Sequence, residues 1–156
     1  MAISKCLKDY LDSHGVDYRI IPHRHTSNST ETAEAAHISG DQLAKSILLE
    51  DENGYFLVVV PASHRVDLGT LHRRLHRQVG LATEDELKDL FADCDVGAIP
   101  PLGEAFGIPS FIDVSLDDSL DVYFEAGDHE ALVHMSGRQF RQLTSHAQHG
   151  RMSHHV

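Results

Sequence analysis

The segment of residues 94–107 constrains the fold more than any other stretch, because its order of residues fits no regular helix or strand. It reads Cys-Asp-Val-Gly-Ala-Ile-Pro-Pro-Leu-Gly-Glu-Ala-Phe-Gly, in which glycines permit positive φ and paired prolines fix φ. Free backbone N–H groups in such a loop need partners, and they suit an anionic or carbonyl oxygen. We interpret the segment either as a shaped binding loop or as a tight connection between a helix and a strand. The N–H groups concerned belong to Gly97, Ala98, Ile99, Leu102 and Gly103.

The composition predicts one folded domain without general affinity for duplex nucleic acid. A chain of 156 residues with 41% hydrophobic residues can bury a substantial core. A formal net charge of -11 disfavours non-specific duplex binding, which depends on neutralising phosphates. Residues 64–77 are the basic exception, and they either hold nucleic acid locally or form a solvated helix face. The apolar run at residues 55–61 is too short to span a bilayer, and the N-terminus lacks a signal-peptide core, so we expect a cytoplasmic protein.

Hydrophobic periodicity predicts short helices and strands that alternate along the chain. Asn53-Gly54 between two apolar runs is typical of a hairpin turn, and Thr83 with Glu86 has the pattern of a capping box. Residues 146–156 are rich in histidine, show no periodicity and are predicted to be a flexible tail. The interleaved pattern predicts a single α/β or α+β domain with a mixed sheet. We expect helices at residues 3–11, 30–36, 68–75, 84–91 and 137–143, strands at 16–21, 43–50, 55–60, 79–82 and 130–135, and a second hairpin joining 111–114 to 120–124.

Three residues are candidates for chemistry. Lys45 lies in an apolar strand, where it is either a charge aimed into a site or a solvent-facing edge lysine, and the second is commoner because lysines are seldom buried. His129 follows the Gly127-Asp128 turn, and such a histidine is more often on the surface or hydrogen bonded than catalytic. Asp113 lies within an apolar strand, and its alternative is an outward-facing position.

Metal-dependent and nucleophilic chemistry find less support in the sequence. His72 and His76 are spaced to share one helix face, but the His-Glu-x-x-His order of zinc hydrolases is absent. No sequence signature pairs Cys94 with a histidine. Glycine-rich nucleotide-binding motifs and the serine-hydrolase elbow are also missing. We therefore predict neither a metal nor a cofactor.

Four motifs in this order resemble the YbaK/prolyl-tRNA synthetase-associated editing domain family. They are Thr-Ala-Glu-Ala-Ala at 32–36, Leu-Ala-Lys-Ser-Ile-Leu-Leu at 43–49, Gly-Ala-Ile-Pro-Pro-Leu-Gly at 97–103 and Ala-Gly-Asp-His at 126–129. The likeness covers roughly residues 3–143. It implies a compact domain with a cleft, built on a mixed, mostly antiparallel sheet with barrel-like curvature and flanked by short helices. Ser46 and the Asp-His-Glu continuation depart from the well-known branches, so their amino-acid specificity is not transferred.

The resemblance also implies a function and its residues. Family members are free-standing aminoacyl-tRNA deacylases that hydrolyse mischarged tRNA, commonly a small wrong amino acid on proline tRNA. The residues that would correspond fall into two groups. They are Lys45, Gly97, Ala98, Ile99 and His129 for catalysis, and Thr26, Ser46, Pro100, Pro101, Asp113 and Gly127 for substrate binding. Apart from the resemblance, the basic segment at 64–77 predicts contact with the tRNA acceptor stem through Arg65, Arg73, Arg74 and Arg77, and its alternative is a solvated helix face.

Partners and domain limits complete the expectations. We expect an editing domain at residues 1–145 and the tail at 146–156. Mischarged tRNA is the expected partner, with a synthetase as a second one, and neither DNA nor a membrane is expected. The alternative function is a tRNA- or synthetase-binding module of the same fold without catalysis.

Overall fold

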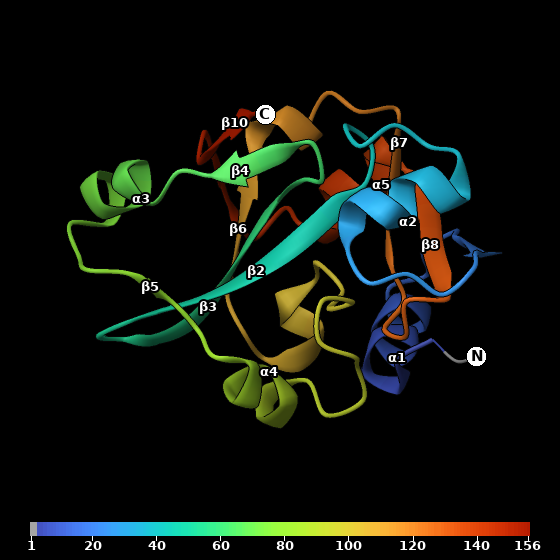
Figure 1. The fold of residues 1–156 in the computed structure, drawn as a ribbon, viewed down its shortest axis with the longest axis horizontal. Helices are drawn as coiled ribbons and strands as arrows, with labels where there is room; N and C mark the ends of the chain where they lie inside the picture. Colours follow the sequence, from blue (N-terminus) through green and yellow to red (C-terminus); the bar gives the residue numbers. More distant parts are fainter. Residues whose placement is uncertain (1–2) are drawn as a thin grey trace.

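A five-stranded mixed sheet carries the centre of the molecule. The computed structural model describes residues 3–156, and in it the long antiparallel pair β2 (Ala44–Asp51) and β3 (Gly54–Pro61) crosses the domain (Figure 1). The turn at Asn53-Gly54 joins these strands, as the sequence predicts. The short β5 (Gly80–Leu81) pairs antiparallel with the outer end of β2, while β6 (Ser110–Asp113) and β9 (Gln148–Gly150) extend the sheet in parallel beyond β3.

A second, three-stranded sheet meets the first at the start of β2. It is antiparallel, in the order β1 (Arg19–Pro22), β8 (Ala131–Ser136) and β7 (Asp121–Glu125). A bridge between Leu43 and Tyr123 joins the two sheets, and the Tyr123 N–H donates to the Gln42 carbonyl oxygen over 2.9 Å. The end of β7 is thereby brought beside the residues that begin β2.

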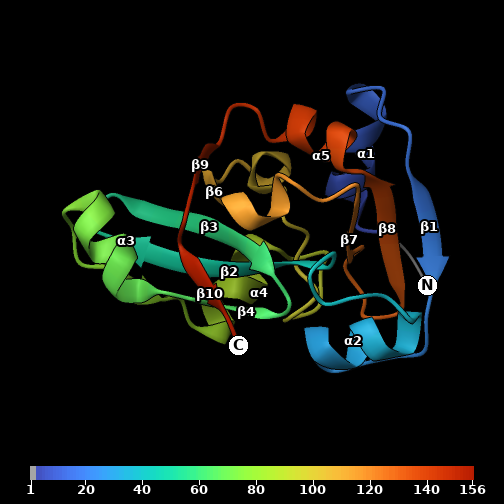
Figure 2. The same ribbon diagram turned by 90° about the horizontal axis from the view of Figure 1, so that it is seen from above.

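Short helices flank both sheets, and their N-caps follow the sequence signals. Asn28 caps α2 (Ser29–Ala36), Thr83 and Glu86 form a capping box on α4 (Glu84–Leu90), and Ser136 caps α5 (Gly137–Leu143). Figure 2 shows α3 (Leu68–Leu75) at the end of the molecule far from the three-stranded sheet, with α2 beside that sheet. The remaining helices are α1 (Lys5–Ser13) and the 3₁₀ turns η1 (Gly103–Phe106) and η2 (Val114–Leu116).

The largest core cluster lies between the three-stranded sheet and the helices α1 and α5. Leu7 and Leu11 of α1 and Phe140 of α5 are fully or almost fully buried there against Phe124 and Val133. Burial of this apolar surface supplies the main driving force for joining the sheets. Within residues 3–156, no helix has the length and apolar character needed to cross a bilayer.

Three expectations about the architecture are wrong. The five-stranded sheet does not close on itself, so the expected barrel-like sheet is not supported. Residues 111–114 and 120–124 do not form a hairpin, because β6 pairs in parallel with β3 and β9 while β7 pairs with β8. The histidine-rich C-terminal residues are not loose either.

The C-terminal residues are instead built into two sheets. β9 joins the five-stranded sheet, and β10 (Ser153–His155) pairs antiparallel with β4 (His64–Val66). Met152, between these strands, is fully buried, and its N–H donates to the Asp113 carboxylate over 2.7 Å. Periodicity failed here because each strand is only three residues long and takes its partner from a distant part of the chain.

Candidate functional site

Lys45 lies at the start of β2, where the two sheets meet, and it is half-buried beside a pocket of about 190 Å³. Within residues 3–156 no carboxylate forms an ion pair with its ammonium group. Burial lowers the pKa of Lys45 below the ordinary lysine value, and the charge of nearby Arg65 lowers this pKa further. The side chain therefore lines a cavity and is not a fully solvent-facing edge lysine.

The Gly/Pro loop forms another wall of this pocket. Gly97 and Ile99 line it together with Lys45 and Ser46. Gly97 has φ +87°, a left-handed value that glycine adopts without strain. The structure thus brings the strand lysine and the first part of the loop, remote from each other in sequence, to one cavity.

The backbone N–H groups of the loop are not equally available. Ala98 N–H donates to the Asp95 carbonyl oxygen over 3.0 Å, and Gly103 N–H donates to the Ser110 hydroxyl over 3.0 Å. The N–H groups of Gly97 and Ile99 make no hydrogen bond to another described residue. Ala98, expected as a donor, is therefore a buried support of the turn, and the two remaining N–H groups belong to residues that line the pocket.

The rest of the pocket comes from segments that the sequence did not single out. The N-terminus of α2 supplies Ser27, Asn28 and Ser29, and the end of β7 supplies Glu125. The Ser46 hydroxyl oxygen is buried and has no hydrogen-bond partner among the described residues. An ammonium group, two free N–H groups and an unpaired hydroxyl together suit a ligand rich in oxygen.

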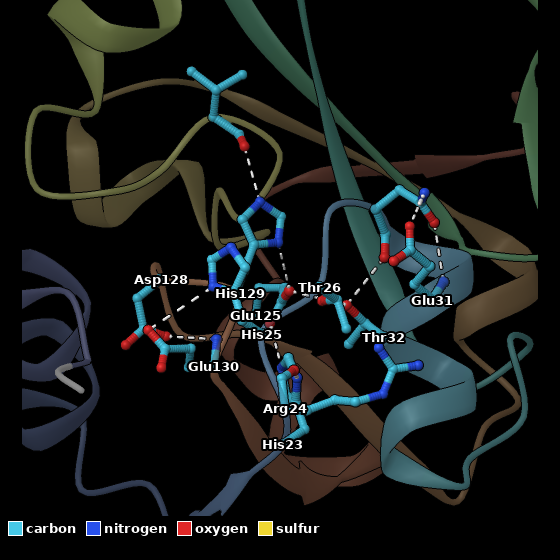
Figure 3. Close-up of polar contacts among 12 residues, drawn as sticks. His23, Arg24, His25, Thr26, Glu31, Thr32, Glu125, Asp128, His129 and Glu130 are labelled. Atoms are coloured by element: carbon cyan, nitrogen blue, oxygen red, sulfur yellow. Dashed lines mark hydrogen bonds and ion pairs between the residues drawn. The ribbon is translucent and has the colours of Figure 1, made fainter.

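His129 lies behind Gly97 rather than in the lining of the pocket. Its Nε2 is 2.9 Å from the Val96 carbonyl oxygen, and its Nδ1 is 3.2 Å from Oε2 of Glu125 (Figure 3). The ring is almost fully buried, and the residue has a left-handed φ of 61°. Non-glycine residues seldom adopt such a φ, and they cluster at sites where the surroundings impose it.

Glu125 is the main residue that sequence reasoning missed. The residue is 6% exposed, and its carboxylate also accepts from Thr32 Oγ1 over 3.2 Å, while Oε1 lies 3.0 Å from His23 Nε2 (Figure 3). The available signal was a glutamate that ends an apolar strand four residues before His129. Its significance depends on His23, which is distant in sequence.

Several expected substrate-binding residues do not line the pocket. Thr26 is buried, with its N–H donating to the His129 carbonyl oxygen over 3.2 Å, and so it supports that turn. Gly127 accepts from Asp95 N–H over 2.7 Å. Pro100 is buried, and Pro101 lines a separate small cavity near Tyr10. These residues shape the surroundings of the site.

Asp113 is placed elsewhere by the structure. Its buried carboxylate binds the Met152 N–H and the Ser115 N–H and hydroxyl, and it borders a different pocket, formed with β10. The structure does not bring it together with Lys45. The outward-facing alternative is also wrong, because the side chain anchors the C-terminal segment.

The four arginines separate into two groups. Arg65 on β4 lines a cavity of about 370 Å³ that adjoins the candidate pocket through Lys45, which lines both. Arg73, Arg74 and Arg77 lie on or just after α3, at the far end of the molecule (Figure 2). Arg74 donates to the His149 carbonyl oxygen, and Arg77 forms a 2.9 Å ion pair with buried Asp51. The basic segment is therefore not one surface, and only Arg65 adjoins the pocket.

Cys94 is a poor candidate for a nucleophile. Burial raises the pKa of its thiol to about 12, and the carboxylate of Asp93 adds to this rise. The reactive thiolate is accordingly scarce at neutral pH. Among the described residues, no group of three or more His, Cys, Asp or Glu side chains is arranged to hold a metal ion.

Solved structures share this fold. A hypothetical protein, APE2540, superposes with a TM-score of 0.85 at 23% identity, covering 96% of this chain and 100% of its own. A protein provisionally described as a trans-editing enzyme for prolyl tRNA synthetase superposes with a TM-score of 0.82 at 24% identity, covering 97% and 96%. Identities this low establish the fold alone. No curated protein matches the chain significantly in sequence.

The sequence itself shows the family. Residues 23–143 match the aminoacyl-tRNA editing domain, and the chain therefore belongs to this family, also known as the YbaK family. The matched residues include every residue that lines the candidate pocket, and also His129.

Proposed function

We propose that the protein is a free-standing trans-editing deacylase, which hydrolyses the ester of a tRNA charged with the wrong amino acid. The observation that carries this proposal is the pocket lined by Lys45, Gly97 and Ile99, whose ammonium group and N–H groups have no ion-pair or hydrogen-bond partner among residues 3–156. Family membership supplies the class of reaction. The substrate expected is a small non-cognate amino acid on proline tRNA.

The chemistry asks for positioning and charge stabilisation rather than a protein nucleophile. An aminoacyl ester is already activated, and water adds to its carbonyl carbon to give a tetrahedral oxyanion. The N–H groups of Gly97 and Ile99 would donate to that oxyanion, and the intermediate then expels the ribose oxygen, which takes up a proton. A neighbouring ribose hydroxyl of the substrate would orient the water.

Lys45 would anchor the terminal phosphate or the carbonyl oxygen as a fixed positive charge. The cavity that it shares with Arg65 is also lined by Thr30, Ser63, His64 and the C-terminal Val156. A phosphate placed there would meet two cations at once, which makes this cavity the natural place for the tRNA end.

The volume of about 190 Å³ favours a small aminoacyl group. Exclusion by size follows the double-sieve principle, in which the site hydrolyses whatever is small enough to enter. A single methylene changes binding by only about 1–3 kcal/mol, so several small residues should be accepted with overlapping efficiency.

The test is the decay of mischarged tRNA in the presence of purified protein. Proline tRNA carrying Ala, Ser, Thr or Cys is the panel, with correctly charged prolyl-tRNA as the control. We expect at least one small residue to be released much faster than by spontaneous hydrolysis. If every ester decays at its spontaneous rate or is protected, the protein is a binding module rather than an enzyme.

A further inference from the structure

We propose that Glu125 acts through His129 as a positioning residue, which holds the Val96–Gly97 peptide with its N–H turned into the pocket. This inference rests on the proposed function, because it assigns the support of one oxyanion donor. The Glu125 carboxylate contacts His129, and His129 in turn contacts the Val96 carbonyl oxygen of the Gly/Pro loop.

A chain of short contacts connects Glu125 to the loop. Oε2 of Glu125 lies 3.2 Å from Nδ1 of His129, and Nε2 of the same ring lies 2.9 Å from the Val96 carbonyl oxygen (Figure 3). On the other side, Oε1 lies 3.0 Å from Nε2 of His23, whose Nδ1 is 2.6 Å from the Arg24 carbonyl oxygen. Glu125 is thus clamped between two histidines, each anchored on a backbone carbonyl.

Because a peptide unit is planar, this chain of contacts also determines the direction of the Gly97 N–H. The C=O and N–H of one trans peptide lie in a plane and point in opposite directions. Because His129 holds the Val96 oxygen, the N–H of Gly97 is turned away from His129, and Gly97 lines the pocket. Asp95 N–H, which donates to the Gly127 carbonyl oxygen over 2.7 Å, fixes the start of the same turn.

The contact with Val96 determines which nitrogen of His129 carries a hydrogen. A carbonyl oxygen only accepts, so Nε2 of His129 carries the hydrogen that it gives to Val96. The contact between Nδ1 and Glu125 needs one further hydrogen between its two atoms. The ring is held at one nitrogen by the Val96 carbonyl oxygen and at the other by the Glu125 carboxyl group, and these two contacts fix its orientation.

Packing alone does not explain this arrangement, because the burial of Glu125 and the backbone conformation of His129 are both energetically unfavourable. Glu125 is 6% exposed, and burial of a carboxylate is unfavourable unless it is fully hydrogen bonded. His129 is also held at φ 61°, a left-handed conformation that non-glycine residues seldom adopt because it is strained. Such strain accumulates where a loop must keep one geometry for function.

Glu125→Gln is the first test. We expect kcat for deacylation to fall about 10- to 100-fold with KM within about twofold, because a donor used only in the transition state is lost. Asp121→Asn is the matched control, since Asp121 is on the same strand and its Oδ1 lies 2.9 Å from His134 Nε2, away from the pocket. It should leave both constants unchanged. An unchanged kcat in Glu125→Gln, or a change confined to KM, overturns the proposal.

A second variant separates positioning from independent effects. His129→Asn suits the left-handed backbone and removes the ring. If Glu125 acts through His129, the double variant that combines Glu125→Gln with His129→Asn should have the same kcat as His129→Asn alone. Multiplicative losses would contradict the chain of contacts.

A third measurement needs neither a variant nor activity. The imidazole ¹⁵N spectrum of the wild-type protein should show Nε2 of His129 protonated, and the Gly97 amide signal should shift in Glu125→Gln but not in Asp121→Asn. An unprotonated Nε2 or an unmoved Gly97 signal overturns the inference even if deacylation is observed. Absence of deacylation with a shifted Gly97 signal rejects the proposed function instead.

Discussion

Gly97 and His129 lie so close that a Cβ added to Gly97 would be 3.2 Å from Nε2 of the His129 ring. The ring cannot retreat easily, because both of its nitrogens are held by hydrogen bonds. Gly97 also has φ +87°. Backbone conformation and close approach therefore both require glycine at this position.

Gly97→Ala should reduce both stability and deacylation. The left-handed φ alone costs about 1 kcal/mol for alanine. Displacement of His129 should also misplace the free N–H, and a shift of this kind can cost on the order of 100-fold in rate. Thermal unfolding and deacylation kinetics measure the two effects. Gly15→Ala is the control, since φ is +63° there but the added Cβ meets open space, and it should lose stability without losing activity.

The rate of deacylation should fall at alkaline pH with the loss of the Lys45 charge. Burial and Arg65 both lower the pKa of Lys45 from the ordinary value of 10.5, so the ammonium form is lost at a lower pH than in free lysine. The alkaline limb of the rate should therefore have a midpoint below 10.5. Arg65→Ala removes one cause of the lowering and should move this limb to higher pH.

The midpoint of the alkaline limb is measured from a pH–rate profile that is corrected for spontaneous ester hydrolysis. Lys45→Arg keeps its charge throughout the accessible range, and any activity it retains should show no such limb. A limb that stays in place in Arg65→Ala would mean that another group titrates.

Cys94→Ala should leave kcat within about twofold, because a thiol with a pKa raised to about 12 supplies almost no nucleophile at neutral pH. Comparison of deacylation rates for the two proteins tests this directly. A loss of tenfold or more, with unchanged thermal stability, would restore a nucleophilic role for this thiol.

The sequence predicts much of the fold where the signals are local. Asn53-Gly54, the capping box at Thr83 and the N-cap at Ser136 are confirmed, because each depends on residues within one turn or helix end. The position of Asp113 could not be predicted, because its partner, the Met152 N–H, comes from the end of the chain. Parallel pairing of β6 likewise has no local signature.

The candidate site could be predicted only in part for the same reason. Lys45 and the Gly/Pro loop carry recognisable motifs, and the structure brings them to one pocket. The unavailability of the Ala98 N–H depends on how the turn closes on Asp95, which residue types alone do not determine. Glu125 gains its meaning from His23 and His129, and that arrangement exists only after β1, β7 and β8 have paired.

The C-terminal segment should contribute to stability. Met152 is fully buried beside the five-stranded sheet, so Met152→Ala should lower the free energy of unfolding by about 2–4 kcal/mol. Urea unfolding measures the change. Leu120→Ala is the control, because Leu120 is 85% exposed, and it should change stability by no more than about 0.5 kcal/mol. Equal stabilities of the two variants would mean that the segment is not docked in solution.

The most direct test compares the deacylation rate of wild-type protein with that of Lys45→Ala on the same mischarged tRNA, with thermal unfolding to establish that both are folded. The ammonium group and the Gly97 and Ile99 N–H groups form one site in this account, so removal of the charge should slow turnover at least about 100-fold. A folded Lys45→Ala protein that releases the amino acid at the wild-type rate would contradict it.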